Sequence, residues 1–153
     1  MVVDVLAGAP APPDAIALQD AERSWTRAEL GARVDERAAD LDAVGHGPGT
    51  VVPVVLDADA EGVATLLALW RVGATPALLS SRLTEPERDA ARAALEGVAG
   101  GAQAILWTSG TAGRPHGVAL SFAALEANAR GSQERLELRA DDVWPVSYTH
   151  LTL

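Results

Sequence analysis

The chain has 153 residues, of which 48% are hydrophobic and 22% charged, and its formal net charge is −9 at pH 7. These values are typical of a single globular domain, and the acidic balance argues against a nucleic-acid-binding protein, which normally presents a basic face. Because the sequence has no cysteine and its three histidines are far apart, disulfides and thiolate catalysis are excluded and no metal site is expected.

Two segments bear on the cellular location. Residues 1–4 have no basic stretch followed by a long apolar run, so the N-terminus does not resemble a signal peptide. The apolar run over residues 63–70 ends at Arg71 and is too short to cross a bilayer. We therefore expect a cytoplasmic protein without a membrane span.

The first predicted elements are an arm, a hairpin and a helix. Residues 7–13 are rich in alanine and proline and indicate an extended arm. A strand is expected over 15–19, with its hairpin partner over 23–25. Thr26 and Glu29 have the spacing of a capping box, which predicts a helix start. The apolar positions that follow at helical spacing are Leu30, Val34, Ala38 and Leu41.

The middle of the chain alternates between strands and helices. Residues 45–49 are rich in glycine but follow a helix and precede a strand, so they indicate a turn rather than a dinucleotide-binding loop. In the strand expected over 51–56, Pro53 favours an edge position or a bulge because proline cannot donate to a ladder. The other expected elements are helices over 61–72 and 84–95 and strands over 76–79, 103–107 and 117–120. This alternation predicts an α/β fold with a mostly parallel sheet and flanking helices.

One stretch of the sequence has the composition of an anion-binding loop. Residues 108–118, which follow the strand at 103–107, are dense in glycine and hydroxyl groups. Glycine lets backbone N–H groups approach an anion, the hydroxyls add donors, and Arg114 adds a fixed positive charge, so the stretch suits a polyphosphate. It matches neither a Walker A loop nor a nucleophile elbow, and a polar surface turn is the alternative. The expected phosphate-binding residues are Thr108, Ser109, Gly110, Thr111, Ala112, Gly113, Arg114, His116 and Gly117.

This stretch resembles the phosphate-loop signature of the adenylate-forming superfamily, which includes acyl-CoA synthetases, peptide-synthetase adenylation domains and luciferases. The matching residues are Thr108, Ser109, Gly110, Thr111, Gly113, Pro115, Gly117 and Val118. Residues 24–30, 67–74 and 81–84, and Asn128, are similar to further elements of the family in the same order. The short spacing from Leu83 to Thr108 is similar to that of compact aryl-acid ligases of the o-succinylbenzoate–CoA ligase type.

The resemblance implies a two-step reaction. A small carboxylic acid attacks the α-phosphate of Mg-ATP to give an acyl adenylate and pyrophosphate, and a thiol, usually coenzyme A, then displaces AMP. The expected cofactors are therefore ATP, Mg²⁺ and coenzyme A, and residues 108–117 would hold the β- and γ-phosphates. Catalytic residues are not assigned. The alternatives are an adenylation domain that loads a carrier protein and a non-catalytic nucleotide-binding or interaction module.

Two loop positions depart from the family signature. Ala112 stands where the family has threonine or serine, and His116 stands where it has lysine, a residue that this sequence lacks altogether. An imidazole is fully charged only in mild acid, whereas an ammonium group stays charged through neutral pH. We hypothesise that His116 holds phosphate more weakly than lysine and that activity rises as the pH falls toward 6.

Residues 145–153 also depart from the family pattern. After Trp144 the family continues with a strand of the kind L-P-L-x-H-x-x-G, which residues 145–153 do not fit, so His150 is given no catalytic role. We expect residues 1–145 to be a partial N-terminal AMP-binding domain, incomplete at its C-terminal side. Residues 146–153 resemble translated adapter sequence and are expected to be a non-native tail. Such a fragment would be inactive alone, with an open sheet edge.

Overall fold

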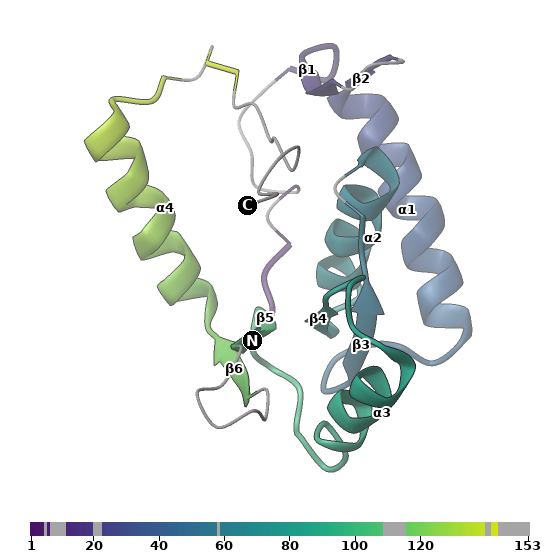
Figure 1. The fold of residues 1–153 in the computed structure, drawn as a ribbon. Coiled ribbons are helices and arrows are strands. Elements are labelled where there is room, and N and C mark those ends of the chain that lie inside the picture. Colours follow the sequence, from purple (N-terminus) through teal and green to yellow (C-terminus); the bar gives the residue numbers. More distant parts are fainter. Residues whose placement is uncertain are drawn as a thin grey trace.

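The computed structural model describes residues 1–4, 6, 12–19, 23–57, 59–108, 116–139 and 142–143. Figure 1 shows the arrangement of the helices and strands. In chain order they are β1 (Ile16–Gln19), β2 (Ser24–Thr26), α1 (Arg27–Ala43), β3 (Val51–Val55), α2 (Ala60–Arg71), β4 (Thr75–Leu79), α3 (Glu85–Ala93), β5 (Ala104–Thr108), β6 (His116–Leu120) and α4 (Phe122–Leu136).

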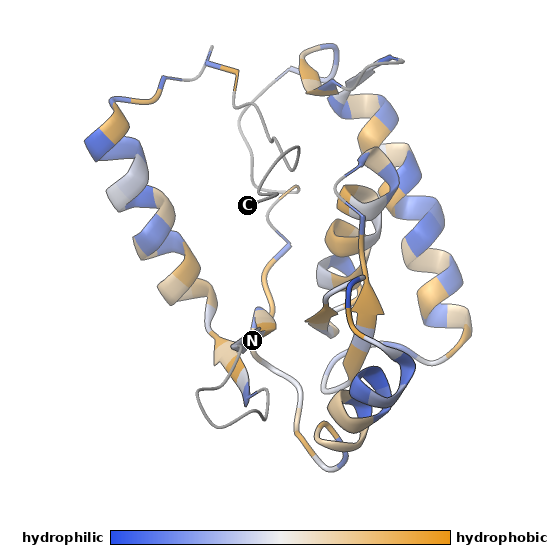
Figure 2. Ribbon diagram, in the orientation of Figure 1, coloured by the Kyte–Doolittle hydropathy of each residue, from blue (hydrophilic) through white to orange (hydrophobic). Residues whose placement is uncertain are grey.

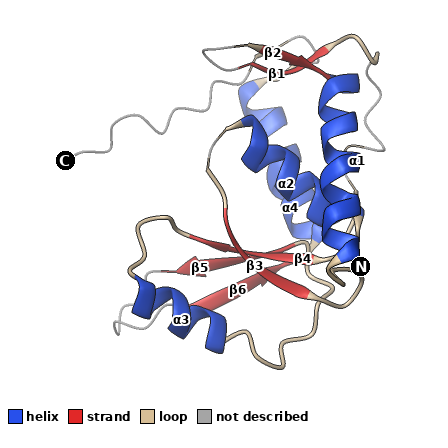
Figure 3. Ribbon diagram, turned by 90° about the vertical axis from the view of Figure 1, so that its right-hand side faces the viewer, coloured by secondary structure: helices blue, strands red, loops and turns tan. Residues whose placement is uncertain are grey.

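Strands β3, β4, β5 and β6 form one sheet in that order. The first three run parallel, and β6 returns antiparallel to β5. Helices α2 and α3 make the two parallel connections, as parallel strands require a crossover. Figure 3 shows α1 and α2 on one side of the sheet and α3 on the other. The predicted α/β fold, with a mostly parallel sheet and flanking helices, is confirmed.

The predicted hairpin and the first helix are confirmed. Strands β1 and β2 pair antiparallel, with Leu18 opposite Trp25. At the start of α1, the Thr26 N–H donates to the Glu29 carboxylate over 2.7 Å, and the Glu29 N–H donates to the Thr26 hydroxyl over 3.2 Å. These bonds satisfy amides that the first helical turn leaves free, which explains why the helix begins here.

The main core lies between α1 and α2. Its buried residues are Leu30, Val34 and Ala38 from α1 and Ala64, Leu67 and Ala68 from α2. Each large apolar side chain buried here contributes roughly 1.5–3 kcal/mol. Beside the core, the Arg33 guanidinium bonds to the Glu61 carboxylate over 2.8 Å and thereby ties the two helices together. Figure 2 shows hydrophobic residues concentrated on β3 and α2 and hydrophilic residues on the outer turns of α1 and α3.

Pro53 lies where the sequence predicted. Strand β3 is an edge strand of the sheet, and Pro53 pairs with Ala77 of β4 while remaining exposed. An edge strand has one side without ladder partners, so the missing N–H of proline costs little there.

Helix α4 was not among the expected elements. Ser121 is its N-cap, and the Ser121 hydroxyl accepts from the Ala124 N–H over 3.2 Å. None of the α4 residues is buried, and Figure 1 shows the helix standing away from α1 and α2. Its weak apolar periodicity explains why the sequence pattern did not indicate it.

Some expectations fall on other parts of the chain. Residues 7–11 of the expected arm, and the expected boundary at 145–146 with the tail that follows, lie outside the described residues. Within the described residues, no helix combines the length and the apolar character needed to cross a bilayer.

Candidate functional site

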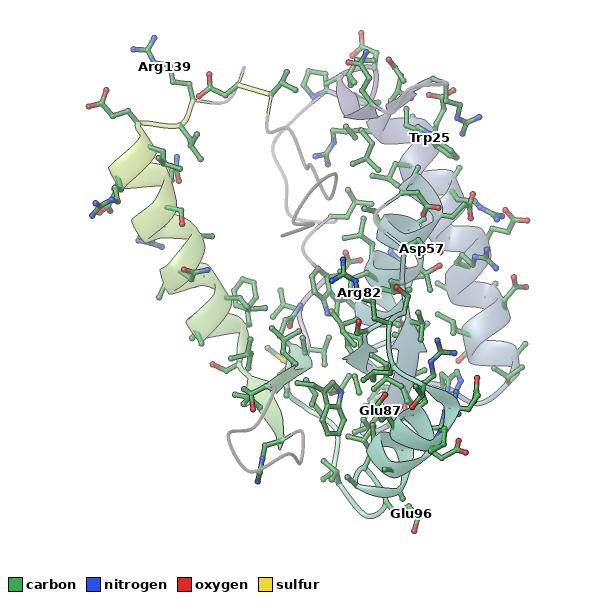
Figure 4. All side chains as sticks on the ribbon, in the orientation of Figure 1. Trp25, Asp57, Arg82, Glu87, Glu96 and Arg139 are labelled. Carbon is green, nitrogen blue, oxygen red and sulfur yellow. The ribbon has the colours of Figure 1, made fainter. Side chains whose placement is uncertain are left out.

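The carboxyl ends of the three parallel strands meet at one edge of the sheet. Asp57 follows β3, Arg82 follows β4, and Thr108 is the last residue of β5. Figure 4 shows Asp57 and Arg82 on the neighbouring loops that leave β3 and β4. In open α/β sheets, ligands bind outside this edge. Thr108, the first residue of the predicted phosphate loop, therefore lies at the edge of the sheet where a ligand is expected.

Strands β5 and β6 bring the two ends of the predicted loop together. Thr108 lies directly opposite His116 in the antiparallel register, and the Thr108 hydroxyl donates to the His116 carbonyl oxygen over 3.4 Å. Side chains of directly opposed residues project from the same face of a sheet, about 5 Å apart. Both residues are exposed, so the threonine hydroxyl and the imidazole are available to a ligand at the loop base.

The interior of the predicted loop cannot be placed in this way. The expected phosphate-binding residues that lie outside the described part of the chain are Ser109, Gly110, Thr111, Ala112, Gly113 and Arg114. Their roles stay predictions. The three described members of the set, Thr108, His116 and Gly117, are brought together at the loop base.

Gly117 has a packing role that the sequence did not indicate. It pairs with Trp107 across the hairpin. A Cβ at this position would lie 3.2 Å from Cγ2 of Ile105 and 3.6 Å from the Trp107 ring. Glycine therefore lets two large β5 side chains lie over the backbone of β6. Its role in phosphate binding is a separate prediction.

The N-terminus of α3 follows β4 and is capped by its own residues. The Glu87 carboxylate accepts from the Thr84 N–H over 2.8 Å and from the Thr84 hydroxyl over 2.7 Å. These two bonds, the backbone one first, lower the pKa of Glu87 below its ordinary value. A carboxylate thus already occupies the positive end of this helix.

The N-terminus of α2 is also capped, here by the side chain of its N-cap residue. The Asp59 carboxylate accepts from the Gly62 N–H over 2.7 Å. The Asp57 carbonyl oxygen lies against the backbone of Gly62. A Cβ at position 62 would be only 2.0 Å from that oxygen. Neither helix start that faces this edge therefore offers an uncapped anion site, which leaves residues 108–117 as the candidate.

Sequence reasoning did not select Arg82 as a site residue. It is exposed on the loop that leaves β4, at the same edge as Thr108. A residue just after a parallel strand lies at the edge where ligands bind, so this position is the signal that could have marked Arg82 as a candidate. Among the described residues, no group of three or more histidine, aspartate or glutamate side chains is arranged to hold a metal ion.

Comparisons with known proteins identify the family of the chain. The family described as AMP-binding enzyme matches residues 7–96. The chain is 30% identical to 2-succinylbenzoate–CoA ligase of Bacillus cereus over 86% of its own length and 35% of that protein. It is also 31% identical to a nonribosomal peptide synthetase, CymA, of Salinispora arenicola, over 88% of its own length and 2% of that protein.

Solved structures share the fold. The O-succinylbenzoate coenzyme A synthetase of Bacillus subtilis in complex with AMP superposes with a TM-score of 0.74 at 22% identity, over 85% of this chain and 45% of that one. Apo MatB of Rhodopseudomonas palustris superposes with a TM-score of 0.71 at 23% identity, over 90% of this chain and 38% of that one. The chain thus spans about a third of the curated ligase relative's length, and the family match ends before Thr108.

Proposed function

Because the chain belongs to the AMP-binding enzyme family, we propose that it forms the first part of the nucleotide-binding domain of an acid–thiol ligase. In the first step, a carboxylate oxygen of the acid attacks the α-phosphorus of ATP and the bond to the β-phosphate breaks, which releases pyrophosphate. In the second step, the thiol of coenzyme A attacks the acyl carbon and AMP leaves. Mg²⁺ would neutralise phosphate charge, and no residue of this chain is assigned to it.

The observation that carries the proposal is the position of Thr108 and His116, the described residues at the two ends of the predicted loop. They pair with each other where β5 reaches the carboxyl edge of the sheet. In the proposed site, the glycine amides and the hydroxyls of Ser109 and Thr111 donate to the β- and γ-phosphates. The Thr108 hydroxyl would exchange its bond to the His116 carbonyl oxygen for one to a phosphate oxygen. Arg114 and His116 supply positive charge. Fixed donors of this kind stabilise the charge that develops on the leaving pyrophosphate.

The substrate class follows from the relatives. The likeness to 2-succinylbenzoate–CoA ligase supports an aryl acid of that type as the carboxylate substrate. Residues 1–145 would be the partial domain, and polypeptide beyond Trp144 would supply the remaining catalytic residues. We place the complete enzyme in the cytoplasm.

A second candidate is an adenylation domain that loads a carrier protein. The match to the peptide synthetase CymA, at 31% identity, favours it. The chemistry of the first step is the same in both cases, and only the thiol acceptor differs. A carrier-protein domain encoded downstream would support this candidate, whereas thioester formation with free coenzyme A would support the ligase.

The test has two stages. Reading the source gene past the codon for Trp144 shows whether the frame continues into the rest of an adenylating enzyme. With the full-length protein, acid-dependent exchange of pyrophosphate into ATP measures the first step directly. A frame that ends at Leu153, or a full-length protein without exchange for any aryl or acyl acid, would refute the proposal.

The phosphate role of the loop has its own test. Arg114→Met should raise the Michaelis constant for ATP about tenfold, because a charge-assisted contact to phosphate contributes about 1.5 kcal/mol or more. Arg139→Met is the matched control, since Arg139 is exposed beyond α4, as Figure 4 shows. Equal effects of the two substitutions would contradict a specific role of residues 108–117.

A further inference from the structure

The N-terminal residues 1–4, here named the strap, bind to the start of β5. The Val3 N–H donates to Oε1 of Gln103 over 2.8 Å, and Nε2 of Gln103 donates to the Val3 carbonyl oxygen over 2.7 Å. Gln103 is only 1% exposed. The Asp4 carboxylate accepts from Nε of Arg71 over 2.9 Å. The strap is therefore attached both to the residue before β5 and to the end of α2.

Gln103 also joins two other parts of the molecule through its backbone. Its N–H donates to the Leu120 carbonyl oxygen of β6 over 2.7 Å. Its carbonyl oxygen accepts from the indole N–H of Trp70 in α2, also over 2.7 Å. One buried glutamine thus connects the β5–β6 hairpin to α2 and to the strap. A buried amide with all these bonds formed is costly to disturb, because any group left unpaired loses about 1–3 kcal/mol.

The rest of β5 is attached more firmly to β6 than to the body of the sheet. The register pairs β5 with β6 from Ala104 opposite Leu120 to Thr108 opposite His116. Within the described residues, the register between β4 and β5 pairs Ala77 with Ile105. The hairpin is therefore a unit whose bonds to the body concentrate near Gln103.

The far end of this unit carries the loop base. Thr108 is five residues beyond Gln103, which corresponds to about 17 Å along a strand. A tilt of about 5° at Gln103 would displace Thr108 by about 1.5 Å over this strand length. Misplacements of about 1 Å at a reacting group reduce rates by up to about a hundredfold.

We propose that Gln103 is a positioning residue that, by clamping the strap, fixes the β5–β6 hairpin and thereby sets the position of the phosphate loop. This inference rests on the proposed function, because it requires that residues 108–117 bind phosphate. Because Gln103 is buried at the start of β5, it would act on the site through β5 and not by contact with a ligand.

The test compares Gln103→Met with Val34→Ala in the full-length protein. Methionine keeps the length of the side chain and removes both bonds to Val3. Val34→Ala instead opens a cavity in the α1–α2 core, where Val34 is fully buried, and leaves the side-chain bonds of Gln103 in place. Gln103→Met should raise the dissociation constant of MgATP about five- to tenfold and speed amide exchange in β5 and β6 relative to β3. Val34→Ala should lower thermal stability and leave both quantities unchanged while the protein is folded.

A second perturbation removes the strap instead of the Gln103 side chain. Deletion of residues 1–4 should weaken MgATP binding by at least a similar factor, because it also removes the bonds of Met1 to Gly101 and of Asp4 to Arg71. Adding Gln103→Met to the deletion should have little further effect, because its bonds to Val3 are already lost. Independent, multiplicative effects would overturn the inference. So would wild-type affinity or wild-type hairpin exchange in Gln103→Met. A wild-type protein that does not bind MgATP would instead refute the proposed function, and the positioning role with it.

Discussion

Gly62, in the first turn of α2, is expected not to tolerate even a methyl group. A Cβ there would lie 2.0 Å from the carbonyl oxygen of Asp57 and 3.1 Å from its carbonyl carbon. An ordinary carbon–oxygen contact is about 3.3–3.6 Å. Because the Asp57 oxygen belongs to the backbone and a Cβ is bonded directly to the backbone of residue 62, no side-chain rotation can relieve the clash. Gly62→Ala must therefore displace the β3–α2 loop from the helix by more than about 1 Å.

The magnitude follows from two opposing effects. Alanine in a helix is favoured over glycine by roughly 0.5–1 kcal/mol, and overpacking of a close contact costs about 1–3 kcal/mol, occasionally more. We expect the cost of the clash to be at or above the upper end of this range, because neither atom can move by side-chain rotation. The expected net loss of unfolding free energy is about 2 kcal/mol. In a chain of this length, that lowers the melting temperature by about 4–8 °C.

Gly31 provides the matched control. It lies in α1, and nothing lies within 4 Å of the position that its Cβ would take. Gly31→Ala should therefore gain the helix preference alone and raise the melting temperature by about 1–4 °C. Thermal unfolding followed by far-UV circular dichroism measures both variants. If Gly62→Ala also raises the melting temperature, the close approach of Asp57 to α2 is not a feature of the protein in solution.

Two further substitutions test the charges near the site. His116→Lys in the full-length enzyme should lower the Michaelis constant for ATP about three- to tenfold, because an ammonium group is charged throughout neutral pH; an unchanged constant would contradict a phosphate role for this position. Glu87→Gln removes a carboxylate whose pKa lies below its ordinary value of 4.5. Such a group stabilises the fold above pH 4.5 and loses this effect as the pH falls through its folded-state pKa. The variant should therefore melt below wild type at pH 7, by a difference that shrinks as the pH falls below 4.5. Glu96→Gln, an exposed position on the turn after α3, should melt like wild type throughout; a difference for Glu87→Gln that stays constant would refute the assignment.

The elements that could be predicted are those specified by neighbouring residues. The capping pair Thr26 and Glu29 and the spacing of Leu30, Val34 and Ala38 define α1 without information from the rest of the chain, and the structure confirms both. The edge position of Pro53 follows equally from local chemistry, because proline lacks the N–H that a central strand needs. Helix α4 has no buried face, so its sequence carries little of the periodicity on which such predictions depend.

The contacts that could not be predicted join residues distant in sequence. The bonds between Val3 and Gln103 span 100 residues, and no spacing rule indicates them. Ile105 and Trp107 explain why position 117 is glycine, but only after the hairpin register is known. The candidate site also has a part that could be predicted from the sequence and a part that could not. The residue types of the loop pointed to phosphate, whereas the pairing of Thr108 with His116 emerged only from the fold.

The connection at the end of β5 explains why side-chain charge should matter in this loop. In a Walker-type loop, the chain enters a helix whose N-terminus contributes about half a positive charge. Here the next element after the loop is the antiparallel strand β6, and the helix starts of α2 and α3 are already capped by Asp59 and Glu87. A polyphosphate bound at residues 108–117 would therefore depend on loop amides and on side-chain cations. In a chain without lysine, this requirement falls on arginine and histidine, which makes position 116 the point where the departure from the family signature should change affinity most.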